Sequence, residues 1–225
     1  MKTKCTVVKC RPEMKAAIFD LDGLMVDTER PYIKILIDES KKRGFDVPLE
    51  IFAKCIGIDD MGSEKILKDC IGSNYPYREV RTVALERFLD YLKAHGIKHR
   101  PGLLILLNHL KEKQIPIAVA SSTATERGKL KLKLANIIQY FDALAFGDEV
   151  ANCKPAPDVF LLAASRLNVS VQDCIGFEDS PAGLCALHNA GIKSVFIKDT
   201  VQPDQSILDF VYKSYQSLDK AVELF

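Results

Sequence analysis

The second half of the chain alternates short apolar segments with amphipathic ones, and this alternation limits the possible folds more than any other feature. Between residues 115 and 197, four apolar segments have the length of strands: IPIAVASS, YFDALAF, DCIGF and KSVFI. The segments between them space their apolar residues every three or four positions, as amphipathic helices do. Strands that alternate with helices predict βαβ units and a parallel sheet covered on both faces. We therefore expect an α/β, doubly wound, Rossmann-like core.

One more apolar segment, AAIF at Ala16–Phe19, lies far upstream and predicts the first strand of the same sheet. From residue 30 to about residue 94, the apolar spacing is that of helices throughout. We therefore expect an α/β core made of residues 15–28 and 98–225, with an all-α cap inserted at 29–97. The hinges of this cap are expected at residues 26–31 and 96–102. Residues 1–14 are interpreted as an N-terminal extension without an assigned function.

Composition argues against several classes of partner. The chain has 31 Lys and Arg against 30 Asp and Glu, a net charge of +1, so nothing electrostatic favours nucleic acid or a membrane surface. Its seven cysteines form no CxxC pair, which favours a reducing compartment over a zinc site. No apolar run approaches the roughly 20 residues that span a bilayer. We expect a cytoplasmic monomer with no nucleic-acid or membrane partner.

Polar side chains follow the predicted strands where each strand ends. They are Asp20 and Asp22, Ser121 and Ser122, and Glu178 and Asp179, with Lys154 in a connecting loop. Because the carboxyl ends of parallel strands meet at one edge of a sheet, we expect these groups to converge there. Several carboxylates in one place need a cation, and Mg²⁺ prefers oxygen ligands. Lys154 adds a second positive charge, which would offset an incoming phosphate.

The first of these loops has the form DxDG, which suits acid–base and nucleophilic chemistry. Asp20 and Asp22 lie two residues apart, before a turn at Gly23, so both carboxylates can face one reacting group from different angles. This arrangement favours Asp20 as a nucleophile and Asp22 as a general acid and base.

Four motifs in order, DLDGLMVDTE, IAVASS, KPAPD and GFEDSPAG, resemble those of the haloacid dehalogenase superfamily. The similarity is greatest to its capped phosphatases, the group that includes β-phosphoglucomutase. The resemblance implies an aspartyl-phosphate on Asp20 and an acid–base role for Asp22. It also implies that Mg²⁺ is bound by Asp20, the Asp22 carbonyl oxygen and Asp179, with Glu178 beside it. Phosphate is expected to bind Ser121 and Lys154, with Ser122 as the neighbouring candidate.

The cap decides between related reactions. Its loop CIGIDDMGSEKIL offers Asp59, Asp60 and Met61 as candidate substrate contacts, although an exposed loop explains them equally well. The mutases of the family carry an arginine there, and a histidine near the place of Pro31 and Tyr32; this chain has neither. We therefore predict a Mg²⁺-dependent phosphatase that hydrolyses a small phosphorylated metabolite, either a sugar phosphate or a nucleoside-type phosphate. The alternatives are a β-phosphoglucomutase-like mutase and a catalytically idle binding protein.

Overall fold

The core is a six-stranded parallel sheet in the order β3-β2-β1-β4-β5-β6. The computed structural model describes residues 14–56, 58, 60–199 and 201–225. The strands are β1 Ala16–Phe19, β2 Ile117–Ser121, β3 Ala143–Phe146, β4 Cys174–Glu178, β5 Lys193–Ile197 and β6 Lys213–Tyr215. This confirms the α/β, doubly wound prediction. The sequence did not predict β6, because three residues at the sheet edge, KSY, carry no apolar pattern.

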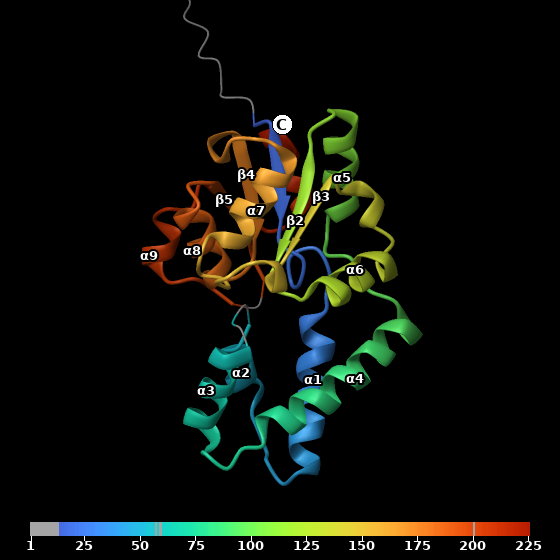
Figure 1. Cartoon of the computed structure of the whole chain (residues 1–225), viewed down its shortest axis with the longest axis vertical. Helices are drawn as coiled ribbons and strands as arrows, with labels where there is room; N and C mark the ends of the chain where they lie inside the picture. The colour runs from blue at the N-terminus through green and yellow to red at the C-terminus, as the bar shows by residue number, and fades with distance from the viewer. Residues whose placement is uncertain (1–13, 57, 59, 200) are drawn as a thin grey trace, which may run out of the picture.

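Helices cover both faces of this sheet (Figure 1). The core helices are α5 Leu103–Glu112, α6 Thr125–Leu134, α7 Asp158–Leu167, α8 Pro181–Asn189 and the single turn α9 Gln205–Leu208. Successive side chains of β1 point to opposite faces. Ala17 and Phe19 join the buried cluster that includes α5, whereas Ala16 and Ile18 join the one that includes α7 and α8. A strand buried on both faces is apolar at every position, which explains the uninterrupted AAIF.

Four helices fill the segment between β1 and α5. They are α1 Glu29–Lys42, α2 Leu49–Ala53, α3 Asp60–Ile71 and α4 Tyr77–His95. Their apolar faces form a buried cluster of their own, and α1 and α4 pack side by side below the sheet (Figure 1). The helical spacing expected from residue 30 to about residue 94 does not form continuous helices, since α2 ends at Ala53 and turns follow.

The two chain segments that join these helices to the core run together. Val26, after β1, forms an isolated antiparallel bridge with His99, before α5. Asp199, just after β5, forms ion pairs with Arg30 of the first segment at 2.8 Å and with Arg100 of the second at 2.6 Å. Both connections are therefore fastened to each other and to the same point of the core.

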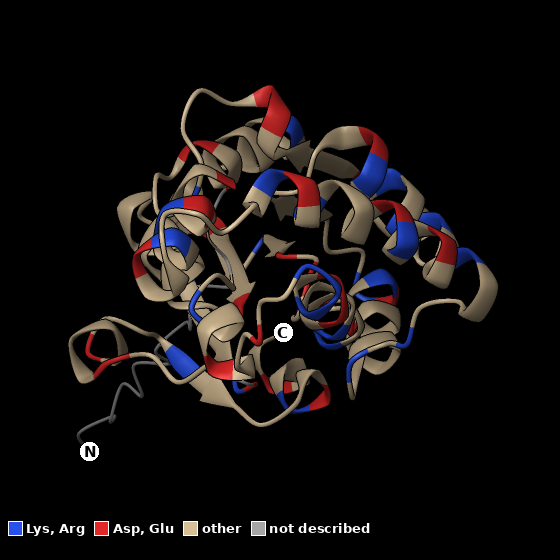
Figure 2. Cartoon of the chain, turned by 90° about the horizontal axis from the view of Figure 1, so that it is seen from below, with Lys and Arg blue, Asp and Glu red and all other residues tan. Residues whose placement is uncertain are grey.

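Positions of basic and acidic residues are interspersed over the helices in the view from below (Figure 2). This distribution agrees with the near-zero net charge. Among the described residues, no helix combines the length and apolarity needed to cross a membrane.

Candidate active site

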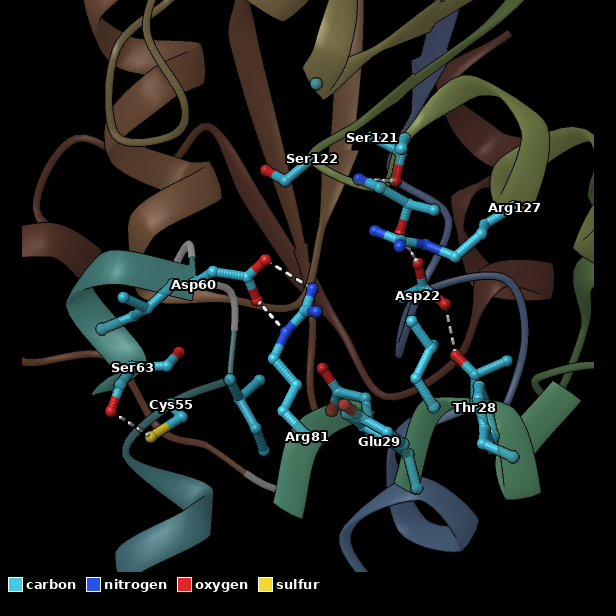
Figure 3. Close-up of a pocket in the computed structure, with 18 of the residues that line it drawn as sticks. Asp22, Thr28, Glu29, Cys55, Asp60, Ser63, Arg81, Ser121, Ser122 and Arg127 are labelled. Atoms are coloured by element: carbon cyan, nitrogen blue, oxygen red, sulfur yellow. Dashed lines mark hydrogen bonds and ion pairs between the residues drawn. The ribbon is translucent and has the colours of Figure 1, made fainter. Parts of the chain in front are cut away.

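The central position of β1 brings the predicted site residues to one edge of the sheet. Asp20 directly follows β1, which lies between β2, ending in Ser121, and β4, ending in Glu178. The strands β2 and β3 lie on one side of β1 and the strands β4 to β6 on the other, and such a switch in strand order is where open α/β sheets bind ligands. A cavity of about 510 Å³ opens there, between the sheet edge and the four inserted helices (Figure 3).

Lys154 connects two of the carboxylates. Its buried ammonium donates hydrogen bonds to Asp20 Oδ1 and, at 2.7 Å, to Glu178 Oε1, and lies 4.6 Å from the ring centre of Phe160. Burial opposes the positive charge, but the two carboxylates prevail and raise the pKa of Lys154. For Asp20 the balance is reversed. Burial raises its pKa to about 7, although Lys154 acts in the opposite direction.

Asp22 is held by three donors from three different segments. Its Oδ1 accepts hydrogen bonds from Thr28 Oγ1 at 2.5 Å and from Lys131 Nζ at 2.6 Å, and its Oδ2 accepts one from Thr123 Oγ1 at 2.7 Å. Burial alone would raise the pKa of Asp22, but the charge of Lys131 and these hydrogen bonds outweigh it and lower the pKa. Asp22 is therefore ionised in this arrangement.

Asp20, Glu178 and Asp179 form a buried group of carboxylates whose oxygens lie within 4.8 Å of one another. Glu178 is already well supplied with donors, because its Oε2 accepts hydrogen bonds from the Asp179 and Ser180 backbone N–H groups and from the Ser180 hydroxyl. By contrast, the Asp179 carboxylate accepts no hydrogen bond from any described residue. Burial and the charge of Glu178 raise its pKa well above the usual value. A cation beside Asp179 would relieve this cost.

Gly23 brings the loop after β1 against the Asp179 carboxylate. It has a φ of +87°, and a Cβ at this position would lie 2.4 Å from Asp179 Oδ2. Only glycine lets the loop after β1 approach Asp179 so closely. The donor set consists of oxygens alone, which is the chemistry that a hard divalent ion such as Mg²⁺ requires. The residues present therefore fit the ion that the sequence motifs implied.

Two of the predicted phosphate ligands, Ser121 and Ser122, lie at the end of β2, the strand beside β1. Ser121 is buried, and its Oγ accepts a hydrogen bond from the Thr123 backbone N–H at 3.1 Å. Ser122 also lines the cavity, but its side chain points away from that of Ser121 (Figure 3). A Cβ on Gly147 would lie 2.3 Å from the Ser122 carbonyl oxygen, so a glycine there lets the next loop pack closely against this one.

Two of the three predicted cap residues line the same cavity, and the third, Asp59, lies outside the described residues. Met61 is 82% exposed. Asp60 accepts a bidentate pair of hydrogen bonds from Arg81 of α4, and Tyr77 Oη lies 3.4 Å from it (Figure 3). Arg81 therefore opposes the charge of Asp60, which the sequence did not indicate.

Sequence reasoning did not identify several side chains that line the cavity. They are Thr28, Glu29, Arg81, Thr123, Arg127 and Lys131. Arg81 follows Asp60 by 21 residues in another helix, so no local motif connects them. Lys131 belongs to KLKLKL, where three lysines alternate with leucines, and the sequence alone does not indicate which one is buried. Thr123 was the most accessible to prediction, because it follows Ser121 and Ser122 directly.

Comparison with known proteins agrees with this geometry. The family model described as haloacid dehalogenase-like hydrolase matches residues 17–197, which is most of the chain. The chain belongs to this family. The predicted family and fold are thereby confirmed.

Individual relatives include enzymes of two kinds. Phosphorylated carbohydrates phosphatase of Thermotoga maritima is 30% identical over 190 residues, which cover 81% of this chain and 84% of that protein. Beta-phosphoglucomutase of Bacillus subtilis is 33% identical over 188 residues, covering 81% and 82%. A crystal structure of beta-phosphoglucomutase from Clostridium difficile superimposes with a TM-score of 0.77 at 25% identity, covering 92% of each chain. Family membership therefore leaves both hydrolysis and phosphoryl transfer between sugar positions to be considered.

Proposed function

We propose that the protein is a Mg²⁺-dependent phosphatase that hydrolyses a small phosphate monoester through an aspartyl-phosphate on Asp20. The observation that carries this proposal is that Asp20 and Asp22 line one cavity together with Ser121 and Lys154. The carboxylate of Asp179, which accepts no hydrogen bond from the described chain, lies within 4.8 Å of Asp20. A nucleophile, a proton carrier, phosphate-binding donors and a cation-binding group are thus adjacent.

In the first step an oxygen of Asp20 attacks phosphorus, and the bond from phosphorus to the alcohol oxygen breaks while Asp22 donates a proton to that oxygen. In the second step a water molecule attacks the phosphorus of the aspartyl-phosphate and passes a proton to Asp22, which releases inorganic phosphate and restores Asp20. Ser121 and Lys154 donate hydrogen bonds to the phosphoryl oxygens as charge develops. Mg²⁺ bound by Asp20, the Asp22 carbonyl oxygen and Asp179 supplies positive charge that offsets the phosphate.

The hydrogen bonds around Asp22 suit the second step directly. Thr28, Thr123 and Lys131 stabilise its ionised form, which is the form that accepts a proton from water. For the first step Asp22 must carry a proton. A phosphate dianion bound beside it favours this, because a neighbouring negative charge raises the pKa of a carboxyl group.

Residues 29–97 act in this proposal as a cap that closes over the cavity and opens to release product. Support comes from the paired connections at Val26 and His99, which lie inside the expected hinge segments 26–31 and 96–102. Closure would exclude bulk water from the bound ester.

The test compares the wild type, Asp20→Asn and Asp173→Asn with a broad panel of phosphate monoesters, in Mg²⁺ and after chelation. Asp173 lies in a surface ion pair with Lys15 and serves as the matched control. We expect the wild type and the control to release phosphate in the presence of Mg²⁺ but not after chelation. Asp20→Asn should release none under either condition. Equal release by Asp20→Asn and the wild type would refute the nucleophile assignment.

A mutase is the second candidate, because two arginines also line the cavity. Arg81 comes from α4 and Arg127 from α6, and both side chains reach the space that an ester would occupy (Figure 3). Either could bind a second phosphate on the substrate. Interconversion of hexose 1- and 6-phosphates without net phosphate release, dependent on a bisphosphate, would establish this reaction instead.

A further inference from the structure

Polar and apolar groups occupy opposite ends of the active-site cavity. The end formed by the sheet edge presents carboxylates, hydroxyls and Lys154. The end formed by the inserted helices is lined mainly by hydrocarbon side chains, among them Ile33, Phe52, Ile56, Ile58, Leu85 and Leu89. A ligand whose phosphate binds at the sheet edge would therefore extend its other end among apolar groups.

Two of the charged groups at the apolar end, Asp60 and Arg81, are already paired with each other, and Glu29 of α1 also lines the cavity. Asp60 and Arg81 form a bidentate ion pair, and the Tyr77 hydroxyl also reaches Asp60. A carbon chain bearing many hydroxyls would lose its hydrogen bonds to water there, and would find few free partners in exchange. An apolar group makes no hydrogen bonds to water, so it would lose none on binding there.

Several apolar side chains at this end are also exposed or partly exposed. Met61 is 82% exposed and Ile58 39% exposed, while Ile56, Leu85 and Leu89 are partly exposed. Exposed apolar side chains that gather in a cavity, rather than scatter over a surface, mark a place where apolar ligand surface binds. These residues belong to three separate segments of the cap, so the cavity wall is formed by its tertiary packing.

We propose that the alcohol part of the substrate carries a hydrocarbon-rich group, such as an unsaturated ring, which packs against Ile56, Ile58 and Leu85. This inference rests on the proposed phosphatase function and narrows its substrate class. It favours esters that bear a ring system over bare polyol phosphates. A second phosphate bound by Arg81 and Arg127 is the competing arrangement, and the test includes it.

The test compares esters of primary alcohols, so that the intrinsic reactivity of the leaving group is nearly equal. The esters are 2-phenylethyl phosphate, glycerol 3-phosphate and glucose 6-phosphate. Glucose 1,6-bisphosphate, which also carries an anomeric phosphate, is added to test the arrangement with a second phosphate. We expect kcat/KM for 2-phenylethyl phosphate to exceed that for glycerol 3-phosphate by about 10-fold or more, because burial of a ring lowers the free energy of the bound state. Leu85→Gln should remove most of this preference. Leu49→Gln, the same change at a 54% exposed residue outside the cavity, should retain it.

A binding measurement keeps this inference separate from the proposed reaction. Asp20→Asn, which retains the cap, is titrated calorimetrically with the same four compounds. Tighter binding of 2-phenylethyl phosphate than of the other compounds supports the inference. It does so even if the wild type hydrolyses none of the esters, because the absence of hydrolysis would refute only the proposed phosphatase reaction. Equal or tighter binding of the polyol esters or the bisphosphate overturns the inference. Ile56→Gln, located in a turn after α2, replaces Leu85→Gln should that variant fail to fold.

Discussion

Replacing Lys154 by methionine tests the electrostatics of the site most directly. Lys154 is buried and shares its charge between Asp20 and Glu178. Methionine fills a similar volume, but it leaves two buried carboxylates without their cation and the Phe160 ring without its ammonium neighbour. The variant therefore separates the contribution of charge from that of packing.

The expected loss of stability follows from the burial of this group. Removing one partner of a buried ion pair costs about 3–5 kcal/mol, because the remaining charge has no compensation. For a chain of this length each kcal/mol lowers Tm by about 2–4 °C, so we expect a decrease of about 6–20 °C. Lys15→Met, which removes an exposed ion pair with Asp173 at 2.9 Å, is the control and should cost no more than about 1 kcal/mol.

The loss should also depend on pH in a definite direction. The pKa of Asp20 is about 7 in the wild type, and removal of the Lys154 charge raises it further. A carboxyl group with a raised folded-state pKa contributes stability below its unfolded-state pKa of about 4, and this contribution is lost as the pH rises through the folded-state value. Lys154→Met should therefore be destabilised less at pH 5 than at pH 8.

Thermal unfolding of both variants and the wild type, followed by circular dichroism from pH 5 to pH 8 with and without Mg²⁺, measures these effects. Mg²⁺ should restore part of the stability of Lys154→Met, since it supplies positive charge to the same carboxylates. A Tm of Lys154→Met within 2 °C of that of Lys15→Met at pH 8 without metal would show that the reasoning about buried charge is wrong.

Three further substitutions test metal binding, stability and proton transfer in turn. Gly23→Ala should weaken Mg²⁺ binding about 10-fold or more, as measured by calorimetry, because the added Cβ displaces Asp179. The control is Gly44→Ala, at a residue with a similar φ of +84° where an added Cβ would have no neighbour within 4 Å. This control should change stability but not Mg²⁺ binding. Glu39→Gln should lower the free energy of unfolding by about 1–2 kcal/mol at pH 7. Hydrogen bonds from Lys42, Arg43 and Arg87 hold the pKa of Glu39 at about 2, so the stabilisation that Glu39 provides is lost as the pH falls from 4.5 to 2. The difference between the variant and the wild type should therefore vanish on acidification. Asp22→Asn should lower kcat by about 10²-fold or more with KM little changed; an unchanged kcat would argue against proton transfer by Asp22.

The fold was predictable from sequence largely because a parallel sheet imposes a simple pattern. The apolar run AAIF is buried on both faces, and it could only be a central strand once the downstream strands were recognised. The polar strand β6 escaped prediction because an edge strand needs neither face fully buried, and its three residues are too few to show a period.

The site likewise contains residues that could be predicted from the sequence and residues that could not. Residues at strand ends could be placed together, because strand order brings the ends to one edge whatever the side chains are. Arg81 and Lys131 could not be placed, because their positions depend on how the helices α4 and α6 are rotated about their axes. In α6 that rotation is set by the packing of Leu132 and by Gly128, where a Cβ would lie 2.2 Å from the Phe146 ring. Such long-range packing leaves no local signature in the sequence.

If residues 29–97 move as the proposed cap, the paired connections that bind Asp199 would restrict that motion. Two separate tethers would allow the cap to tilt and twist, but the Val26–His99 bridge and the shared ion pairs of Asp199 hold the two strands of the hinge together. The motion left to the proposed cap would be a rotation about this bridge. A substrate would then enter through the opening that such a rotation makes between the inserted helices and the sheet edge, where the cavity lies.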